Sequence, residues 1–435
     1  MISQKEYARR RKQLMRMTGE GSVIIVRAAP EKIRNNDVHY AYRQDSDFLY
    51  LSGFREPGAM LVLVPGGKGG KAVMFCREKD PKREMWDGPM AGLDGAIADF
   101  GMDQSFPMEE ADKHLPALLK GSERIYYDLG RDIDFDHKLI GWMNEFRSKA
   151  HRDFHAPDEI IALDHLLHDM RLFKSRVELT AMRKSARVAV EGHILAMQSC
   201  KPGMNEADIH AVLLHTFTRH QCETSYLPIV GSGANACVLH YIANRDPMDD
   251  GDLLLIDAGA EYDGYASDIT RTFPVNGKFS AAQKDLYEVV LAAQLAAIDR
   301  SREGQQWDDV HEAAVEFVAQ GMLDLGIIKG TLEQALEEET YARYYVHKTG
   351  HWLGLDVHDV GDYQVDGHSR ALEPGMVFTV EPGIYIRQDD QTVAERWRGL
   401  GIRIEDNVVV TREDPRILTS GAPKTVSDIE TMMAG

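Results

Sequence analysis

Hydrophobic positions in the first 150 residues follow two alternating patterns. Short runs of β-branched, aromatic or aliphatic residues are separated by longer stretches with helical periodicity. A short apolar run between turn residues is typical of a buried strand, whereas recurrence every three to four residues is typical of a helix. The pattern predicts an α/β module with strands at residues 23–26, 48–51, 60–64, 72–76 and 125–127.

The pattern changes after residue 156. Residues 156–200 show long helical periodicity, which ends at Pro202 and Gly203 because these residues stop helices. We predict a domain boundary near Met170, which gives two domains, 1–170 and 171–435. Further helices are predicted at 205–220, with Asn205 as the N-cap, and at 281–302 and 307–325, and further strands at 377–380, 384–386 and 402–410.

The first twenty residues carry many basic side chains but no apolar core behind them, so they lack the hydrophobic region of a secretory signal. An amphipathic surface helix is the simpler interpretation. The basic residues are Lys5, Arg9, Arg10, Arg11, Lys12 and Arg16. No apolar run approaches the roughly 18 to 20 residues that a membrane-spanning helix needs, so we expect a soluble protein without membrane partners.

Composition narrows the function classes. The 435 residues include 43% hydrophobic and 27% charged residues, which is typical of a soluble globular chain. The net charge of −19 repels nucleic acid, so we expect no nucleic-acid partner. The four cysteines form no CxxC motif and suggest neither a disulfide framework nor a thiolate zinc site. A reducing compartment, the cytoplasm, fits this pattern best.

Two carboxylates lie in the segment 253–273, where an Asp263-Gly264 turn signal joins two apolar runs and predicts a β-hairpin. In such a hairpin Asp257 and Asp268 fall nearly opposite each other. Facing carboxylates in a buried setting repel strongly unless a proton or a cation lies between them. On this segment alone, a solvent-facing hairpin with two ordinary surface acids is the simpler interpretation.

Two more carboxylates stand in apolar strands. Glu381 ends an almost wholly apolar strand just before a Pro-Gly turn. Period-two alternation puts Ile402 and Ile404 on one face of the predicted strand 402–410, and Arg403 and Glu405 on the other. Each acid alone could be exposed, but buried carboxylates need partners, and four such acids in apolar strands favour a shared site.

Histidines cluster in the same half of the chain, at His240, His347, His351 and His358. A single histidine on an apolar face is more often a satisfied core residue than a ligand, but three of these lie within one glycine-bearing aromatic segment. Carboxylates with imidazoles and no thiolate favour Mn, Co, Fe or Zn, and two divalent cations balance four carboxylates. The residues alone therefore predict a two-metal hydrolase.

Four motifs carry a resemblance to a known family. They lie at 257–274 (Asp-Ala-Gly-Ala-Glu-Tyr, then Ser-Asp-Ile-Thr-Arg-Thr-Phe-Pro), 350–358, 381–385 and 401–406, and the segment 42–54 adds an N-terminal counterpart. Over nearly its whole length the chain resembles the pita-bread metallopeptidases, and among them the Xaa-Pro aminopeptidases (aminopeptidase P). The resemblance implies an N-terminal α/β domain of aminopeptidase P type, residues 1–170. It also implies an α+β pita-bread (creatinase/aminopeptidase-type) catalytic domain, residues 171–435.

The resemblance implies two divalent metal ions, with Mn²⁺ expected and Co²⁺ or Zn²⁺ as alternatives. Asp257 would hold one metal, and Asp268 and Glu405 would bridge both. His351 and Glu381 would complete the second. A hydroxide shared by the metals would attack the scissile carbonyl.

Further residues receive roles from the same resemblance. His240 and His358 match histidines that orient the substrate and stabilise the transition state, and Glu381 would carry a proton to the leaving nitrogen. Arg403 matches an arginine that supports the metal ligands and the substrate pocket. The proline-side pocket is assigned to Leu239, His347 and Tyr385, and Asp37 and Trp86 match residues that approach the active site of a neighbouring subunit, which implies a homodimer or homotetramer.

The expected function is therefore release of the N-terminal residue from peptides with proline at the second position. The main alternative is a prolidase, which cuts Xaa-Pro dipeptides with the same five ligands, although the 42–54 segment and Trp86 favour the aminopeptidase. Methionine aminopeptidases generally lack an α/β domain of this size. A non-catalytic pita-bread peptide-binding protein is also open, but such relatives lose the carboxylates that are complete here.

Overall fold

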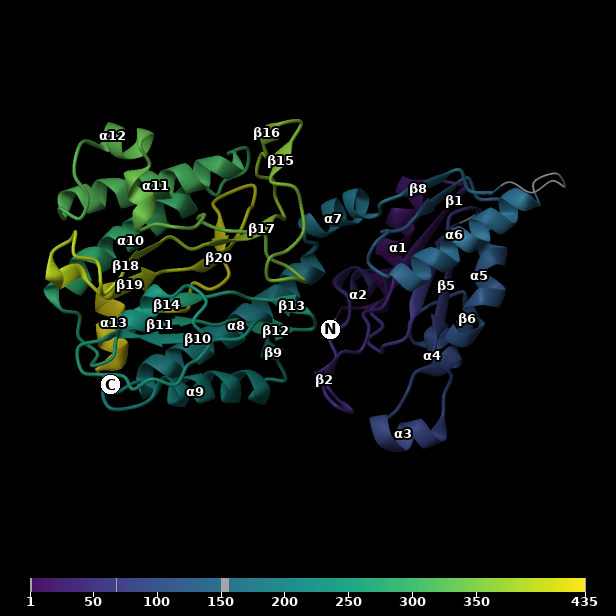
Figure 1. Ribbon diagram of the computed structural model, residues 1–435, viewed down its shortest axis with the longest axis horizontal. Coiled ribbons are helices and arrows are strands. Elements are labelled where there is room, and N and C mark those ends of the chain that lie inside the picture. The colour runs from purple at the N-terminus through teal and green to yellow at the C-terminus, as the bar shows by residue number, and fades with distance from the viewer. Residues whose placement is uncertain (1, 68, 150–155, 435) are drawn as a thin grey trace. The chain divides into compact units, whose positions relative to one another are not determined.

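The computed structural model describes residues 2–67, 69–149 and 156–434. Its chain divides into two compact units, Met1–Met170 and Arg171–Gly435. Figure 1 shows the helices and strands of each unit. Among the described residues, no helix is long and apolar enough to cross a membrane.

The first unit is built on a six-stranded mixed sheet with the strand order β6-β5-β4-β1-β7-β8. Strands β1, β7 and β8 are parallel, as are β5 and β6, while β4 runs antiparallel to both of its neighbours. These strands are β1 (Ser22–Arg27), β4 (Met60–Val64), β5 (Lys71–Cys76), β6 (Gln104–Pro107), β7 (Arg124–Tyr126) and β8 (Glu159–Ile161). Their apolar side chains pack against α5 and α6 in one core.

The helices of the first unit include one that the sequence pattern assigned wrongly. They are α1 (Gln4–Thr18), α2 (Ser46–Ser52), α3 (Pro81–Asp87), α4 (Gly92–Ala98), α5 (Ala111–Leu119) and α6 (Ile133–Ser148), with α7 (Asp164–Leu172) at the end, and a hairpin of β2 (Ile33–Asn35) and β3 (Val38–His39). Residues 48–51 belong to helix α2, so the strand predicted there is wrong. The Asp45 side chain caps α2, Gly53 ends it in the left-handed conformation, and every residue between is buried, so the segment shows no one-sided periodicity.

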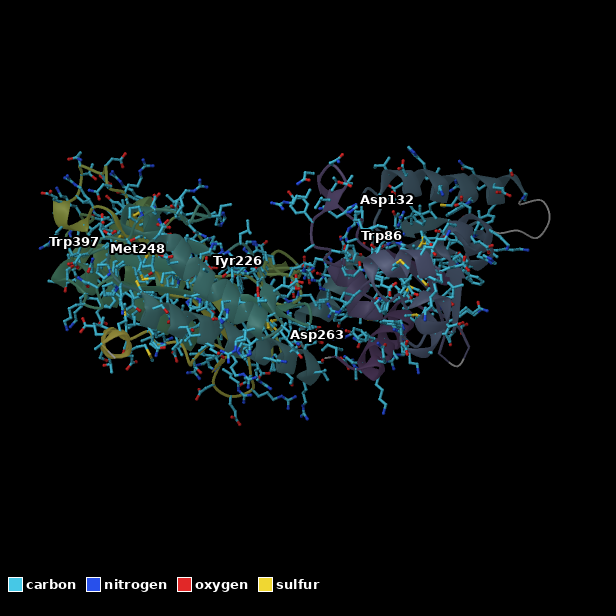
Figure 2. The ribbon with its side chains drawn as sticks, turned by 90° about the horizontal axis from the view of Figure 1, so that it is seen from below. Trp86, Asp132, Tyr226, Met248, Asp263 and Trp397 are labelled. Atoms are coloured by element: carbon cyan, nitrogen blue, oxygen red, sulfur yellow. The ribbon has the colours of Figure 1, made fainter. Side chains whose placement is uncertain are left out.

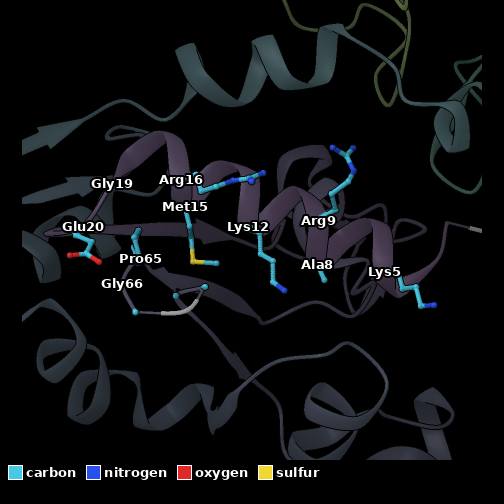
Figure 3. A pocket seen from close by; sticks show the side chains of 13 residues that line it. Lys5, Ala8, Arg9, Lys12, Met15, Arg16, Gly19, Glu20, Pro65 and Gly66 are labelled. Atoms are coloured by element: carbon cyan, nitrogen blue, oxygen red, sulfur yellow. The ribbon is translucent and has the colours of Figure 1, made fainter.

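Helix α1 only partly fits the surface helix predicted for it. Arg10 and Arg11 are buried, and their guanidinium groups donate to the backbone carbonyls of Tyr50 and Leu51 at 3.0 and 2.9 Å. Other basic side chains of α1 line an open groove beside the turn that follows β4 (Figure 3). The basic residues of α1 therefore divide into a buried structural pair and an exposed set.

The second unit consists of several small antiparallel sheets between helices. Helices α8 and α9 pack on the sheets of β9 (Glu223–Thr224), β10 (Ile229–Ser232) and β11 to β14, whereas α10 packs on the sheets of β17 to β20 and is covered by α11 (Figure 1). The helices are α8 (Arg176–Ser199), α9 (Glu206–Arg219), α10 (Ala281–Arg300), α11 (Trp307–Asp324), α12 (Leu332–Glu337) and α13 (Val426–Met433). The predicted N-cap of α9 is confirmed, because the Asn205 side chain accepts a hydrogen bond from the Ala207 N–H at 2.9 Å.

The predicted hairpin of residues 253–273 forms, but it is interrupted. Its strands are β11 (Leu253–Asp257), β12 (Ala260–Tyr262), β13 (Tyr265–Ala266) and β14 (Thr270–Pro274). Asp263 and Gly264 make the turn with φ values of 57° and 87°. Between the paired segments the chain is irregular, so Asp257 is paired with Thr270 rather than with Asp268. A Cβ at Gly259 would lie 1.7 Å from the Ser267 carbonyl oxygen, so this close crossing requires glycine.

The last strands differ from the prediction in one respect that matters for the site. They are β17 (Val377–Val380), β18 (Gly383–Ile386), β19 (Leu400–Arg403) and β20 (Asp406–Val409), with β21 (Arg416–Ile417) at the edge. The single strand predicted over 402–410 is wrong, because β19 pairs with β18 whereas β20 pairs with β17. Ile404 and Glu405 lie at the switch between the two sheets.

Candidate metal centre

A cavity of about 740 Å³ in the second unit is lined by all five side chains predicted to bind metal. Asp257, Glu381 and Glu405 lie at or next to the ends of strands, Asp268 lies between β13 and β14, and His351 lies in an irregular segment bonded to β17. These ligand candidates are Asp257, Asp268, His351, Glu381 and Glu405. Ligand atoms of Asp268, His351 and Glu405 all lie within 4.8 Å of one another. The fold therefore brings together residues that lie up to nearly 150 positions apart in the sequence.

The imidazole of His351 points its Nε2 atom at the carboxylates. This atom lies 3.4 Å from Asp268 Oδ2 and 3.4 Å from Glu381 Oε1. The other ring nitrogen, Nδ1, lies 2.9 Å from the Trp352 carbonyl oxygen, to which it donates. A histidine that ligates a metal typically holds its second nitrogen in this way, so the orientation suits a ligand.

Glu405 is the most constrained carboxylate of the group. It is 1% exposed, and its Oε2 atom accepts a hydrogen bond from Thr270 Oγ1 at 2.7 Å. Its Oε1 atom is buried and has no hydrogen-bond partner among the residues that the structure describes. An unsatisfied buried polar atom costs about 1–3 kcal/mol, and more when it is charged. A cation in the cavity would remove this cost.

Tyr226 and Arg403 form hydrogen bonds with the carboxylates of Asp257 and Asp268. The Tyr226 hydroxyl (labelled in Figure 2) contacts both Asp257 Oδ1 and Asp268 Oδ1. Arg403 Nη2 donates to Asp257 Oδ2 at 2.7 Å, so Arg403 lies next to a predicted ligand. Sequence reasoning missed Tyr226, because it stands in no motif and only the folded chain places it between the two acids.

Burial and mutual repulsion disturb the pKa values of the whole group. Burial raises the pKa of Asp257 to about 6 and that of Glu381 to about 7, and it raises the pKa of Glu405 further above its usual range. Burial opposes a charged His351, but its hydrogen bond to Asp268 and the charge of Glu381 outweigh burial and raise the pKa of His351 to about 9. For Asp268, burial is likewise outweighed by His351, so its pKa is lowered.

The donor set fits divalent cations of the first transition row. Two buried carboxylates, two half-buried ones and one imidazole converge, no thiolate is among the described residues that line the cavity, and one carboxylate oxygen is left unsatisfied. Without a cation, so many acids close together in a cavity are stable only if some of them are protonated. The arrangement can bind and activate a small molecule between metal ions and nearby histidines.

Three histidines border the cavity beside the ligands. His347 Nε2 lies 2.9 Å from the Tyr385 hydroxyl, which also accepts from Arg403 Nη1 at 2.8 Å. Within the described parts of the chain, His240 and His358 make no hydrogen bond, so their rings are free to meet a ligand. The His358 ring lies 4.2 Å from that of His351, and burial together with the charge of His351 lowers the pKa of His358.

The remaining predicted substrate residues lie in different places. Leu239 lines the cavity together with the histidines, whereas Tyr385 does not line it and supports His347 from behind. Asp37 and Trp86 belong to the first unit, Asp37 in the turn of the β2–β3 hairpin and Trp86 on α3, and both side chains are exposed. The described residues that line the cavity belong to the second unit.

Comparison with known proteins agrees with this geometry. Residues 180–412 match metallopeptidase family M24, and residues 7–126 match the aminopeptidase P N-terminal domain. The Xaa-Pro aminopeptidases of Haemophilus influenzae and Escherichia coli are each 41% identical to this chain, over 99% of this chain and 98% of theirs. The solved structure of Pseudomonas aeruginosa aminopeptidase PepP is 52% identical and superposes with a TM-score of 0.97 over 100% of this chain and 98% of that one.

The chain therefore belongs to metallopeptidase family M24, and it is an enzyme of the hydrolase class with the pita-bread fold in its second unit. Within that family it groups with the Xaa-Pro aminopeptidases. Its first unit matches the aminopeptidase P N-terminal domain. Both the fold class and the family predicted from the sequence motifs are confirmed.

Proposed function

We propose that the enzyme removes the N-terminal residue from peptides that have proline at the second position. The observation that carries the proposal is the complete set of five ligand side chains around a cavity that is also lined by His240, His347 and His358. Full-length similarity to Xaa-Pro aminopeptidases supports the choice of substrate. A solved structure of E. coli aminopeptidase P, 41% identical to this chain with a TM-score of 0.96, is zinc-substituted and in complex with product.

The proposed cofactors are two divalent cations, Mn²⁺ in the first place, with Co²⁺ or Zn²⁺ as alternatives. Asp257 would hold one cation, Asp268 and Glu405 would lie between the two, and His351 with Glu381 would complete the second position. When bound, such a pair activates water as a nucleophile and polarises the scissile carbonyl. Glu405 Oε1 has no hydrogen-bond partner in the described structure, and this supports a cation at the position that Asp268 and Glu405 share.

The chain's own residues then handle protons and charge. Glu381 accepts a hydrogen bond from Thr379 Oγ1 at 3.1 Å, and burial raises its pKa to about 7, which suits proton transfer to the leaving nitrogen near neutral pH. His358 faces the cavity without a partner in the described structure and would donate to the developing oxyanion. A donor of this kind contributes about 100- to 1000-fold in turnover.

Selectivity for proline has a physical basis in the cavity wall. The imide nitrogen of an Xaa-Pro bond has no hydrogen to donate, so the site needs no acceptor there. The ring needs apolar surface, and the cavity offers the side chains of Leu227, Ile229, Leu239, Ile242 and Val357. His347, held by Tyr385, would form one side of this pocket.

The alternative is a prolidase, which would share the ligands. The matched aminopeptidase P N-terminal domain favours the aminopeptidase. The test is to load purified protein with Mn²⁺ and assay it on an Xaa-Pro-Yaa tripeptide and an Xaa-Pro dipeptide side by side. We expect a higher kcat/KM on the tripeptide. Hydrolysis of the dipeptide alone would establish the prolidase instead.

The protein is further proposed to act in the cytoplasm as a homodimer or homotetramer. Its cysteines are all free, which suits a reducing compartment. Met85 and Trp86 on α3 are 85% and 87% exposed, an unusual position for large apolar side chains and one that suits contact with a second subunit. Sedimentation of the wild type and of Trp86→Ala tests this, and a strictly monomeric wild type with full tripeptide activity would contradict it.

A further inference from the structure

Glu206 is a fully buried carboxylate that the mechanism does not use. It is the first residue of helix α9, and its side chain is 0% exposed. Buried acids are rare unless their oxygens are satisfied by several donors. The partners of Glu206 therefore indicate what it is for.

All four of these partners belong to one segment, residues 232–246. Oε1 accepts from the Ser232 N–H at 2.8 Å and from Asn235 Nδ2 at 3.0 Å. Oε2 accepts from the Tyr241 hydroxyl at 2.8 Å and from the Asp246 N–H at 2.9 Å. The Glu206 N–H also donates to the Asp246 carbonyl at 3.0 Å, so the carboxylate joins both ends and the middle of the segment.

The same segment carries Leu239 and His240, which line the cavity. Val238 and Ile242 are 52% and 54% exposed, whereas Leu239 and Tyr241 pack against the neighbouring apolar cluster. The hydrogen bond from the Tyr241 hydroxyl to buried Glu206 fixes the side chain of the residue next to His240. Loss of the hydrogen bond between Tyr241 and Glu206 should free the Tyr241 side chain, and Tyr241 directly follows His240 in the chain.

We propose that Glu206 is a positioning residue for the substrate: it holds segment 232–246 so that Leu239 and His240 meet the peptide. The proposal rests on the proposed function, because it assigns these two residues to the substrate. Among the described residues, no hydrogen bond joins Glu206 to the five ligand candidates. Glu206 should therefore affect substrate binding and leave metal binding intact.

Three variants separate positioning from general stability. Glu206→Gln replaces one acceptor oxygen by an NH₂ group that faces donors, and Tyr241→Phe removes a single bond while keeping the ring. Glu178→Gln is the matched control, because Glu178 is another buried acid near a helix start in the same unit, and its carboxylate accepts from the Ser175 N–H and from the Tyr265 hydroxyl. None of these partners lies in segment 232–246.

With Mn²⁺-loaded enzyme and an Xaa-Pro-Yaa tripeptide, we expect KM to rise about tenfold in Glu206→Gln and a few-fold in Tyr241→Phe. The Mn²⁺ affinity of both should stay within about twofold of the wild type, and Glu178→Gln should keep the wild-type KM. If Glu206→Gln does not fold, Tyr241→Phe decides the matter. An unchanged KM in the folded variants, or an equal rise in Glu178→Gln, would overturn the proposal.

Hydrogen–deuterium exchange supplies a readout that does not depend on activity. Amides of residues 232–246 should exchange faster in Glu206→Gln and in Tyr241→Phe than in the wild type, and should be unchanged in Glu178→Gln. If the two variants exchange faster than the wild type, but the wild type does not cleave the tripeptide, the proposed function fails and the anchoring of the segment stands. Unchanged exchange in both variants would refute the anchoring itself.

Discussion

Glu405 Oε1 lacks a hydrogen-bond partner in the described structure, and we therefore expect Glu405 to be needed for metal binding. Glu405→Gln should weaken Mn²⁺ affinity by about 100-fold or more and lower turnover by several orders of magnitude, and Asp268→Ala should behave alike. The metal-free Glu405→Gln protein should unfold at a higher temperature than the metal-free wild type, because glutamine does not bear the cost of burying or protonating a carboxylate whose pKa burial raises. Calorimetric titration with Mn²⁺ and thermal unfolding measure both effects.

The exposed Glu395 provides the control, since Glu395→Gln should leave metal affinity and melting temperature unchanged. Full activity of the wild type after chelation of all metal would contradict the assignment of Glu405 and Asp268 as ligands.

His351 and His358 are adjacent rings with different expected roles. His351 Nε2 faces two carboxylates, so His351→Ala should lose the second metal, with affinity falling by about 10- to 100-fold or more. His358 meets no carboxylate within hydrogen-bonding distance in the described structure. We expect His358→Ala to keep both metals and to lose about 100- to 1000-fold in turnover. Metal loss from His358→Ala comparable to that from His351→Ala would show that the assignment is wrong.

Secondary-structure elements place the ligands through close backbone contacts, and Gly350 is the clearest case. A Cβ at this position would lie 1.9 Å from the Thr379 carbonyl oxygen of β17. The neighbouring backbone is tied to the same strand, because the His351 carbonyl accepts from the Thr379 N–H at 2.9 Å. Gly350→Ala should therefore force His351 away from Glu381 and abolish activity, with a loss of stability of about 1–3 kcal/mol.

The comparison variant is Gly141→Ala in α6, where nothing lies within 4 Å of an added Cβ. It should keep full activity and gain about 0.5–1 kcal/mol, because alanine favours the helix over glycine. Urea unfolding and tripeptide hydrolysis of both variants measure these outcomes. A fully active Gly350→Ala would show that the contact to β17 does not position His351.

For the whole molecule, the acids of the cavity predict how pH affects the metal-free protein. The folded-state pKa values of Asp257 and Glu381, about 6 and 7, lie above the usual values for these side chains. The folded protein then binds more protons than the unfolded chain between about pH 4.5 and 7, so stability is highest below this window and falls as pH rises through it. The raised pKa of His351, about 9, extends the same trend upward.

We therefore expect the melting temperature of the metal-free protein to fall from pH 5 to pH 8, and Mn²⁺ to reverse most of this loss by replacing the protons. Calorimetric titration in buffers of different ionisation enthalpy should show proton release on Mn²⁺ binding. The slope with pH should be smaller in Glu381→Gln. A metal-free melting temperature that rises over this range would contradict the raised pKa values of Asp257 and Glu381.

Much of this protein was determined by local sequence. The α/β character of the first unit, the strands at 60–64 and 72–76, and the cap at Asn205 follow from periodicity and turn chemistry, which act over a few residues. The four carboxylates and the histidine cluster stand out because acids in apolar strands need partners, whereas the choice of His351 as the fifth ligand candidate came from the resemblance to a known family. The strand predicted at 48–51 failed because an entirely buried helix shows no periodicity.

Only the tertiary structure decided how distant residues meet. The switch of the chain between β19 and β20 places Glu405 in the cavity, and that switch depends on pairing with β18 and β17 rather than on local preference. Tyr226 contacts Asp257 and Asp268, which lie 31 and 42 positions away, and Glu206 reaches a segment up to 40 positions away. Such contacts form when the whole core packs, so no window of sequence contains the information that specifies them.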